Sequence, residues 1–367
     1  MDFTKIIIPN DLTRFNKSDL DDLATELDML SDIDNKSELA VEIYKQFKQK
    51  QDLSDNFKEI INNKLLAGRT ATKWFKSEDE LKFEEVLEAL SSNNRNAIND
   101  IDTSKVGYNE NLMTSPSIFA IIFDKEQEQM FIRFVYKNGI RHEVNGTNIS
   151  KRLIPAYSTL YIDFKKQLIE YRGDAKKSKK TISSFIRNIN KTNSNFEAKE
   201  KFSFSVENVA DKLSGELIDT ISLPDANVKI DNKKLKGITE VLEAIDGYFE
   251  NKNIEKLGTA LQDINELFDN NIDNNIMPFS SLLLSGLETV GLGSNKELRD
   301  TPLYKYLNTN LTQTTGFIRI QVTENNVVND YTIRVGIQTK SIYFTSDVNE
   351  NVIKYVRDNL FNWHILR

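Results

Sequence analysis

Residues 118–144 read IFAIIFDKEQEQMFIRFVYKNGIRHEV, and residues 157–172 read YSTLYIDFKKQLIEYR. Both stretches hold short runs rich in Ile, Phe, Val and Tyr, and polar turn residues separate the runs, a pattern typical of strands. The charged residues 124–128 predict one turn, and the Asn138-Gly139 pair predicts a hairpin before the next run. We therefore expect an antiparallel sheet of about four or five strands here.

A helix is predicted after the last of these strands. Ile182, Phe185, Ile186 and Ile189 recur at the spacing that places them on one buried helix face. Residues 317–360 repeat the pattern of strands followed by a helix, and Phe131-Ile132-Arg133 matches Phe317-Ile318-Arg319. Two interpretations are open: an internal duplication, or two unrelated units that share a common apolar spacing.

The remaining segments show helical periodicity and an excess of acidic residues. Helices are expected between residues 17 and 91, and again at 238–245, 257–267 and 276–292. The sequence thus predicts an α+β fold in which acidic helical bundle regions alternate with two small antiparallel sheet-plus-helix units. Its expected domains are an acidic helical region 1–105, a basic sheet and helix 106–205, a helical region 206–312 and a C-terminal sheet and helix 313–367.

The central region has a charge opposite to that of the rest of the chain. Residues 133–201 contain 16 Lys and Arg against 6 Asp and Glu, a net charge of +10, whereas the whole chain has −7. The remaining residues therefore sum to −17. Such asymmetry predicts a surface for phosphates or for an acidic partner.

The predicted central helix concentrates this charge at its start. Lys176, Lys177, Lys179 and Lys180 crowd its first two turns, and Arg172 ends the preceding strand. Asp174 is placed to cap the helix, but each nearby cation opposes the helix dipole at about 0.3–1 kcal/mol. A bound anion would reverse that cost, so these five cations form the first candidate nucleic-acid site. The alternative is that the long lysines are simply solvated.

A second candidate site follows Gly68, a predicted helix end. Arg69, Lys73 and Trp74, with Phe75 beside them, combine cations with aromatic rings, which suits phosphate contact and base stacking. In the alternative interpretation Trp74 and Phe75 fill a core.

The first two predicted helices resemble the small SAP-type DNA-binding module in their layout of helix, turn, Lys, Leu and helix. Residues 31–36 would form the turn. The resemblance implies DNA binding, but acidic residues throughout both the first helix and the turn would repel a phosphate backbone. We therefore favour an acidic helical bundle in this region.

Enzyme signatures are few. The chain has no Cys, and its two His are His142 and His364, so thiolate chemistry and a His-rich metal cluster are excluded. Asp163 followed by Glu170-Tyr171-Arg172 resembles the Asp…Glu-x-Lys pattern of divalent-metal nucleases, with Arg in place of Lys. Otherwise we expect no catalytic residue, no metal and no cofactor.

The composition also bears on setting and partners. A chain without Cys, without a secretion signal and without a long apolar run predicts a cytoplasmic protein that does not enter a membrane. Abundant Asn, Ile and Lys indicate an A/T-rich genome, bacterial or phage. We expect a non-enzymatic protein that binds DNA or RNA. The alternatives are a subunit of a bacterial or phage assembly, such as antiviral defence, that meets an acidic protein or a second copy, and the metal-dependent nuclease.

Overall fold

The computed structural model describes residues 1–29, 33–50, 52–77, 80–106, 113–190, 198–224, 254–269, 290–301, 311–324 and 326–361, with a few isolated positions between 236 and 308. These residues form helices and antiparallel strands, so the expected α+β class is confirmed. The chain divides into two compact units, Met1–Gly215 with Arg319–Arg367, and Glu216–Ile318. Parts of the predicted N-terminal, central and C-terminal regions therefore share one unit.

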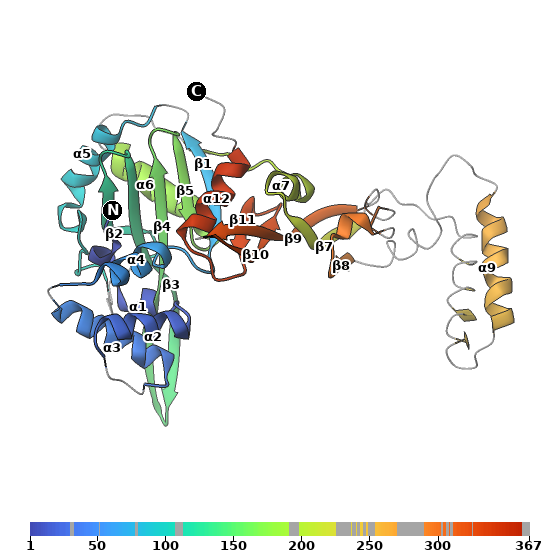
Figure 1. The fold of residues 1–367 in the computed structure, drawn as a ribbon, viewed down its shortest axis with the longest axis horizontal. Coiled ribbons are helices and arrows are strands. Elements are labelled where there is room, and N and C mark those ends of the chain that lie inside the picture. The colour runs from blue at the N-terminus through green and yellow to red at the C-terminus, as the bar shows by residue number, and fades with distance from the viewer. Residues whose placement is uncertain are drawn as a thin grey trace. The chain divides into compact units, whose positions relative to one another are not determined.

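An antiparallel sheet forms the centre of the first unit (Figure 1). Its strand order is β2-β3-β4-β5-β1-β11-β10, followed by the part of β9 from Arg319 onward. The bounds are β1 Ala71–Ser77, β2 Ser117–Asp124, β3 Gln129–Asn145, β4 Asn148–Asp163, β5 Leu168–Arg172, β9 Leu311–Glu324, β10 Val327–Gly336 and β11 Ser341–Phe344. The short β6, Ala198–Glu200, pairs with the end of β1.

Strand β1 joins segments that are far apart in the sequence. Thr72 lies opposite Arg172 of β5 on one side and opposite Ile342 of β11 on the other. Residues 71–77 had not been predicted as a strand, because they follow a helix and no second extended run adjoins them. The two sheet-plus-helix patterns thus meet through a strand from the N-terminal region. Whether they arose by duplication stays a prediction.

The hairpin predicted at Asn138-Gly139 is wrong. Strand β3 continues through this pair, and the register against β4 shifts between Lys137 and Gly139. A glycine inside a strand often marks such a bulge, since it has no side chain to clash. The chain instead reverses after Asn145, where Gly146 has a φ of +63°, a conformation that favours glycine.

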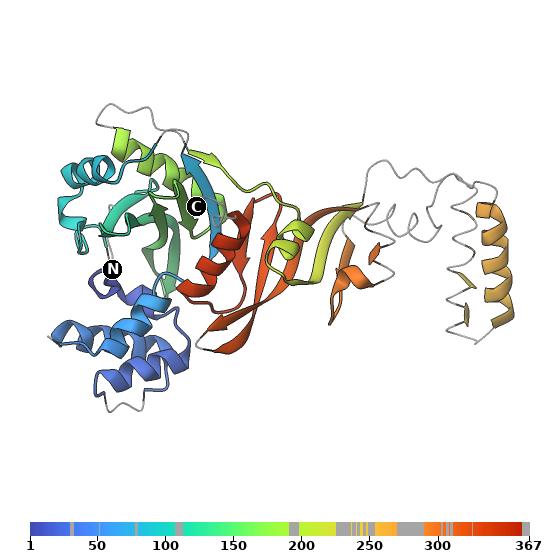
Figure 2. The same ribbon diagram turned by 45° about the horizontal axis from the view of Figure 1, so that its top comes forward.

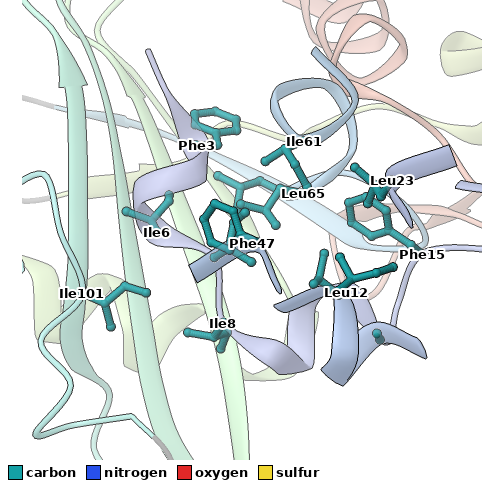
Figure 3. Packing of buried hydrophobic residues seen from close by; sticks show 14 of the residues in the cluster. Phe3, Ile6, Ile8, Leu12, Phe15, Leu23, Phe47, Ile61, Leu65 and Ile101 are labelled. Atoms are coloured by element: carbon teal, nitrogen blue, oxygen red, sulfur yellow. The ribbon is translucent and has the colours of Figure 1, made fainter. Parts of the chain in front are cut away.

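The N-terminal helices cover one face of this sheet. They are the 3₁₀ helix Phe3–Ile6 and α1 Pro9–Leu12, α2 Lys17–Glu26, α3 Lys36–Gln49 and α4 Asp55–Lys64. Their apolar side chains pack with one another and with alternate residues of β2, β3 and β4, among them Phe119, Phe131 and Tyr161. Figure 3 shows Phe3, Ile6 and Phe47 within this core.

The opposite face of the sheet is covered by α5, Phe83–Asn93, and α6, Ser178–Ile189. Ile132 and Leu160, the neighbours of Phe131 and Tyr161 along their strands, pack here with Phe185. Strand side chains alternate between the two faces of the sheet, and helices cover both faces. Successive residues of these strands are therefore buried, which explains the long apolar runs in the sequence. Figure 2 shows the N-terminal helices and α5 with α6 as two separate groups. The predicted buried face of α6 is confirmed, with Ile186 half-buried.

Helix α12, Glu350–Phe361, also belongs to the first unit and buries Val352, Val356 and Leu360. Tyr355 Oη of this helix donates to the Leu213 carbonyl, 3.1 Å away, just after α7, Val206–Lys212. The predicted C-terminal helix is therefore confirmed.

The second unit contains β7 Glu216–Pro224, α9 Ile254–Asp269, β8 Val290–Gly293 and the beginning of β9. β7 and β8 pair antiparallel, with Thr220 opposite Leu292. The region had been predicted as entirely helical, so these strands are a correction; α9 is the helix expected at 257–267. The helices expected at 238–245 and 276–292 fall largely outside the described residues, as does His364. None of the described helices combines the length and apolar character needed to cross a bilayer.

Candidate functional site

A cavity of about 480 Å³ lies in the first unit, where β1 begins at Ala71, β5 ends before Gly173, and β4 passes beside them at Ser158. Its lining is strongly basic. Six cations border it: Arg14, Arg69, Arg133, Arg172, Lys176 and Arg334. Asp174 is the one carboxylate residue among the described residues of the lining. This concentration of positive charge stands out in a chain whose net charge is −7.

Two of the six cations, both arginines, are buried and structural. The two terminal guanidinium nitrogens of Arg133 donate hydrogen bonds to the Asp11 carboxylate, at 2.8 and 2.6 Å, and the guanidinium lies over the ring of Phe119. Its Nε is buried and has no hydrogen-bond acceptor among the described residues. Arg133 therefore neutralises an acidic residue of α1.

Arg172 is the more extensively bonded of the two. Only 3% of its surface is exposed, and its guanidinium donates to Glu170, Glu350 and the Leu66 carbonyl. Burial would lower its pKa, but the charges of Glu350 and Glu170 outweigh burial and raise the pKa above the ordinary value. Arg172 is thus a permanent cation at the base of the cavity, with most of its donors engaged.

Glu170 connects Arg172 to a wider buried ionic cluster. Its Oε2 accepts from Trp74 Nε1 at 2.8 Å and from Arg357 at 3.2 Å, while Oε1 accepts from Arg172. Burial would raise the pKa of Glu170, yet Arg357, Arg172 and the Trp74 hydrogen bond together lower it below its ordinary value. Both oxygens are therefore committed to cations and to an indole N–H.

The other four cations differ from these two in being exposed and unpaired. We call Arg14, Arg69, Lys176 and Arg334 the rim cations; they come from the loop after α1, the loop before β1, the 3₁₀ helix Ala175–Lys177 and β10. Within the described part of the chain, no carboxylate forms an ion pair with any of them. Arg334 stacks over Tyr343, with 5.1 Å from its guanidinium to the ring centre. Arg14 and Arg69 also line a neighbouring depression of about 380 Å³ that contains Asp19 and Asp347.

Hydroxyl and aromatic groups fill the spaces between these cations. Thr70, Ser158, Thr159 and Ser341 contribute hydroxyls, and Tyr136, Tyr157 and Tyr343 contribute rings. Burial raises the pKa of Tyr136 and of Tyr157, so both remain neutral donors at physiological pH. The cavity thus combines cations, neutral donors and rings, the groups that recognise phosphates, sugars and bases.

The lysines predicted around the start of α6 do not form one cluster. Lys176 lines the basic cavity, whereas Lys179 and Lys180 line a separate depression of about 280 Å³ together with Arg187. Lys177 is the half-buried residue before α6 and borders neither. Asp174 accepts from the Lys176 backbone N–H at 3.0 Å, so it caps the 3₁₀ helix Ala175–Lys177 and not α6, whose N-cap residue Lys177 makes no capping hydrogen bond with its side chain.

The second predicted patch is divided as well. Arg69 is exposed in the cavity, but Lys73 is buried and its Nζ lies 2.5 Å from Glu200. Trp74 is fully buried and packs against Phe202. Trp74 and Phe75 therefore occupy the core, as the alternative interpretation expected, and Lys73 is paired instead of solvated.

Apart from Arg172, the described residues of the remaining sequence patterns do not line the basic cavity. The helices of the SAP-like segment bury Leu20, Leu23 and Leu39 beneath the sheet. Asp163 accepts from Tyr161 Oη and from the Lys166 backbone, while Glu170 is engaged as described above. Among the described residues, no three His, Asp or Glu side chains are grouped so that they could hold a metal ion.

Sequence reasoning missed Arg14, Arg133 and Arg334 as site residues. Arg14 and Arg334 are isolated cations in the sequence, and only the sheet brings them to one cavity. Arg133 was noted for its repeat motif and not for its charge. Comparison with known proteins found no family model that matches the chain and no curated protein that matches it.

Proposed function

We propose that the protein binds nucleic acid without chemistry of its own, and that the rim cations contact its phosphates. The observation that carries this proposal is the convergence of four exposed, unpaired cations on one cavity from four separate segments. Unpaired arginines suit phosphate oxygens because the planar guanidinium can donate two parallel hydrogen bonds. Single-ion binding would require fewer cations, whereas a polyanion can engage all four.

The size of the cavity also bears on the proposal. The buried Arg133 and Arg172 add little net charge to it, because Arg133 is paired with Asp11 and Arg172 with Glu170 and Glu350. The cavity volume of about 480 Å³ can admit a nucleotide unit but not a whole duplex. We therefore expect phosphates of the backbone to sit at the rim while the bulk of the nucleic acid stays outside.

The test is a charge-reversal pair with a matched control. Arg69→Glu with Arg334→Glu reverses two rim cations, and Lys179→Glu with Lys180→Glu makes the same change in net charge at the other depression. Fluorescence anisotropy with labelled single-stranded and duplex DNA and RNA, at low salt, gives the affinities. We expect the rim variant to bind at least about tenfold more weakly and the control variant to change less than about threefold.

Two outcomes would contradict the proposal. If only the Lys179/Lys180 variant loses binding, the nucleic acid binds at the start of α6, as predicted from the sequence, and not at the rim cations. If the wild type binds none of the four nucleic acids, the basic cavity would instead fit an acidic protein partner. Membership of a bacterial or phage assembly stays a prediction.

A further inference from the structure

Strands β3 and β4 extend well beyond the strands beside them. β2 pairs with β3 only as far as Val135, and β5 pairs with β4 only as far as Thr159, but β3 and β4 continue to pair to Asn145 and Asn148. We call residues 139–154 the ribbon. At about 3.3 Å per residue it reaches roughly 20–25 Å. Figure 1 shows it as a green extension that passes the N-terminal helices and ends in a free tip.

The ribbon carries exposed apolar side chains of a kind that folded proteins normally bury. Val144 and Ile149 lie directly opposite each other near the tip, with 70% and 65% of their surfaces exposed. Ile140 and Ile154 are exposed as well, at 44% and 41%. A two-stranded ribbon is at best marginally stable in water, so exposed apolar pairs on one indicate that a partner packs against it.

Its charges identify the kind of partner. Arg141 lies directly opposite Arg152. Like charges at directly opposed positions destabilise a strand pair. Glu143 offsets this only weakly, since its carboxylate is 3.7 Å from Arg141 and both side chains are exposed. An anionic partner would remove the repulsion, which favours a phosphate backbone.

The cavity adjoins the base of the ribbon, so one ligand can contact both. Tyr136 and Asn138 of β3, with Ala156 and Tyr157 of β4, line the cavity at the base of the ribbon. A nucleic acid whose phosphates are held by the rim cations would therefore pass beside the ribbon.

From this juxtaposition we propose that the ribbon is an arm that lies in the major groove of double-stranded DNA, an inference that rests on the proposed nucleic-acid binding. The major groove of B-form DNA is about 12 Å wide and admits a two-stranded ribbon. Val144 and Ile149 would meet base edges, where thymine methyl groups offer apolar contact, while Arg141 and Arg152, on the other face of the ribbon, face phosphates. The major groove of A-form RNA is too narrow and deep for such an arm.

The test removes the arm and keeps its base. Ile140 and Leu153 are directly opposite, so residues 141–152 can be replaced by an Asn-Gly turn that closes the shortened hairpin. Two point variants, Val144→Ser with Ile149→Ser and Arg141→Ser with Arg152→Ser, guard against misfolding because all four side chains are exposed. Thermal unfolding checks that each variant is folded.

Affinities are then measured for duplex DNA, single-stranded DNA and duplex RNA. We expect the wild type to prefer duplex DNA, and the shortened variant to lose about tenfold or more for duplex DNA while its affinity for single strands and RNA is unchanged. Methylation protection gives a second readout: guanine N7 in the major groove should be protected by the wild type and unprotected with the shortened variant, while adenine N3 in the minor groove is unaffected.

Three results would overturn the arm. In the first, all three ribbon variants keep the full affinity for duplex DNA. In the second, the wild type protects adenine N3 in place of guanine N7. In the third, sedimentation experiments show that the ribbon is needed only for self-association or for a protein complex. Failure of the proposed function looks different, because then the wild type itself binds no nucleic acid, or binds it equally well after reversal of Arg69 and Arg334.

Discussion

Arg172 shows how burial can determine the role of a charged residue. Its guanidinium is enclosed by Glu170, Glu350 and a main-chain carbonyl, so it stabilises the sheet where it had been predicted to meet a ligand. A lone buried cation would be very costly, whereas one with two carboxylates and a fixed geometry is tolerated. The residue that sequence reasoning placed first among the phosphate contacts is thus the one with the fewest free donors.

Removing Glu170 should therefore be strongly destabilising. Glu170→Gln would leave Arg172 and Arg357 without their shared carboxylate, and we expect the free energy of unfolding at neutral pH to fall by about 3–5 kcal/mol. Urea denaturation measures the change. Glu143→Gln on the exposed ribbon is the control and should shift it by less than about 0.5 kcal/mol.

The same carboxylate predicts a pH dependence. The pKa of Glu170 is lowered in the folded protein, so its stabilisation is present above its ordinary value of 4.5 and is lost as the pH falls below that value. Between about pH 5 and pH 3 the wild type should lose stability more steeply than Glu170→Gln, which has no carboxylate to protonate. Equal slopes for the two proteins would show that folding does not lower the pKa of Glu170.

At the scale of elements, local patterns predicted periodicity well and long-range pairing poorly. The buried face of α6 follows from four apolar residues at helical spacing, and the structure has it as expected. Strand β1 was missed because its neighbours, β5 and β11, come about 100 and 270 residues later in the chain. Asn138-Gly139 misled for a related reason: the dipeptide permits a turn, but pairing with β4 continues past it.

The short 3₁₀ helix before α6 offers a way to raise affinity. Asp174 is the one carboxylate residue among the described cavity lining, and its Oδ1 caps the Lys176 backbone. Asp174→Asn keeps an acceptor for that hydrogen bond and removes the charge. We expect binding of nucleic acid at low salt to tighten by about two- to fivefold, with little change in melting temperature.

Asp22→Asn supplies the control for that variant, since Asp22 is an exposed residue of α2 that does not line the cavity. An equal gain in both variants would indicate a general effect of net charge. Weaker binding by Asp174→Asn would mean that the ligand does not approach the cavity.

On the scale of the whole molecule, charge of opposite signs is segregated. The chain is acidic, with a net charge of −7, and yet four unpaired cations gather at one cavity of the first unit. An acidic surface elsewhere repels a polyanion, so productive encounters are restricted to the basic cavity. The composition indicated a basic region, but it could not show which of its cations form ion pairs inside the protein.

The salt dependence of binding should report the number of phosphates engaged. For duplex DNA the slope of log K against log salt concentration changes by about 0.9 for each phosphate contact. Arg69→Gln with Arg334→Gln should therefore reduce the magnitude of the slope by about 1.8 relative to wild type. Weaker binding with an unchanged slope would mean that the two arginines act by shaping the cavity and not by contacting phosphates.

The position of β1 between β5 and β11 also affects how the protein folds during its synthesis. On the ribosome, residues 71–77 and 168–172 emerge long before residues 341–350. Until translation reaches that point, β1 lacks one neighbour and Arg172 lacks the carboxylate of Glu350. During this interval the nascent first unit exposes one edge of β1, and Arg172 has only one of its two carboxylate partners. A chaperone that covers the exposed edge would be useful at this stage.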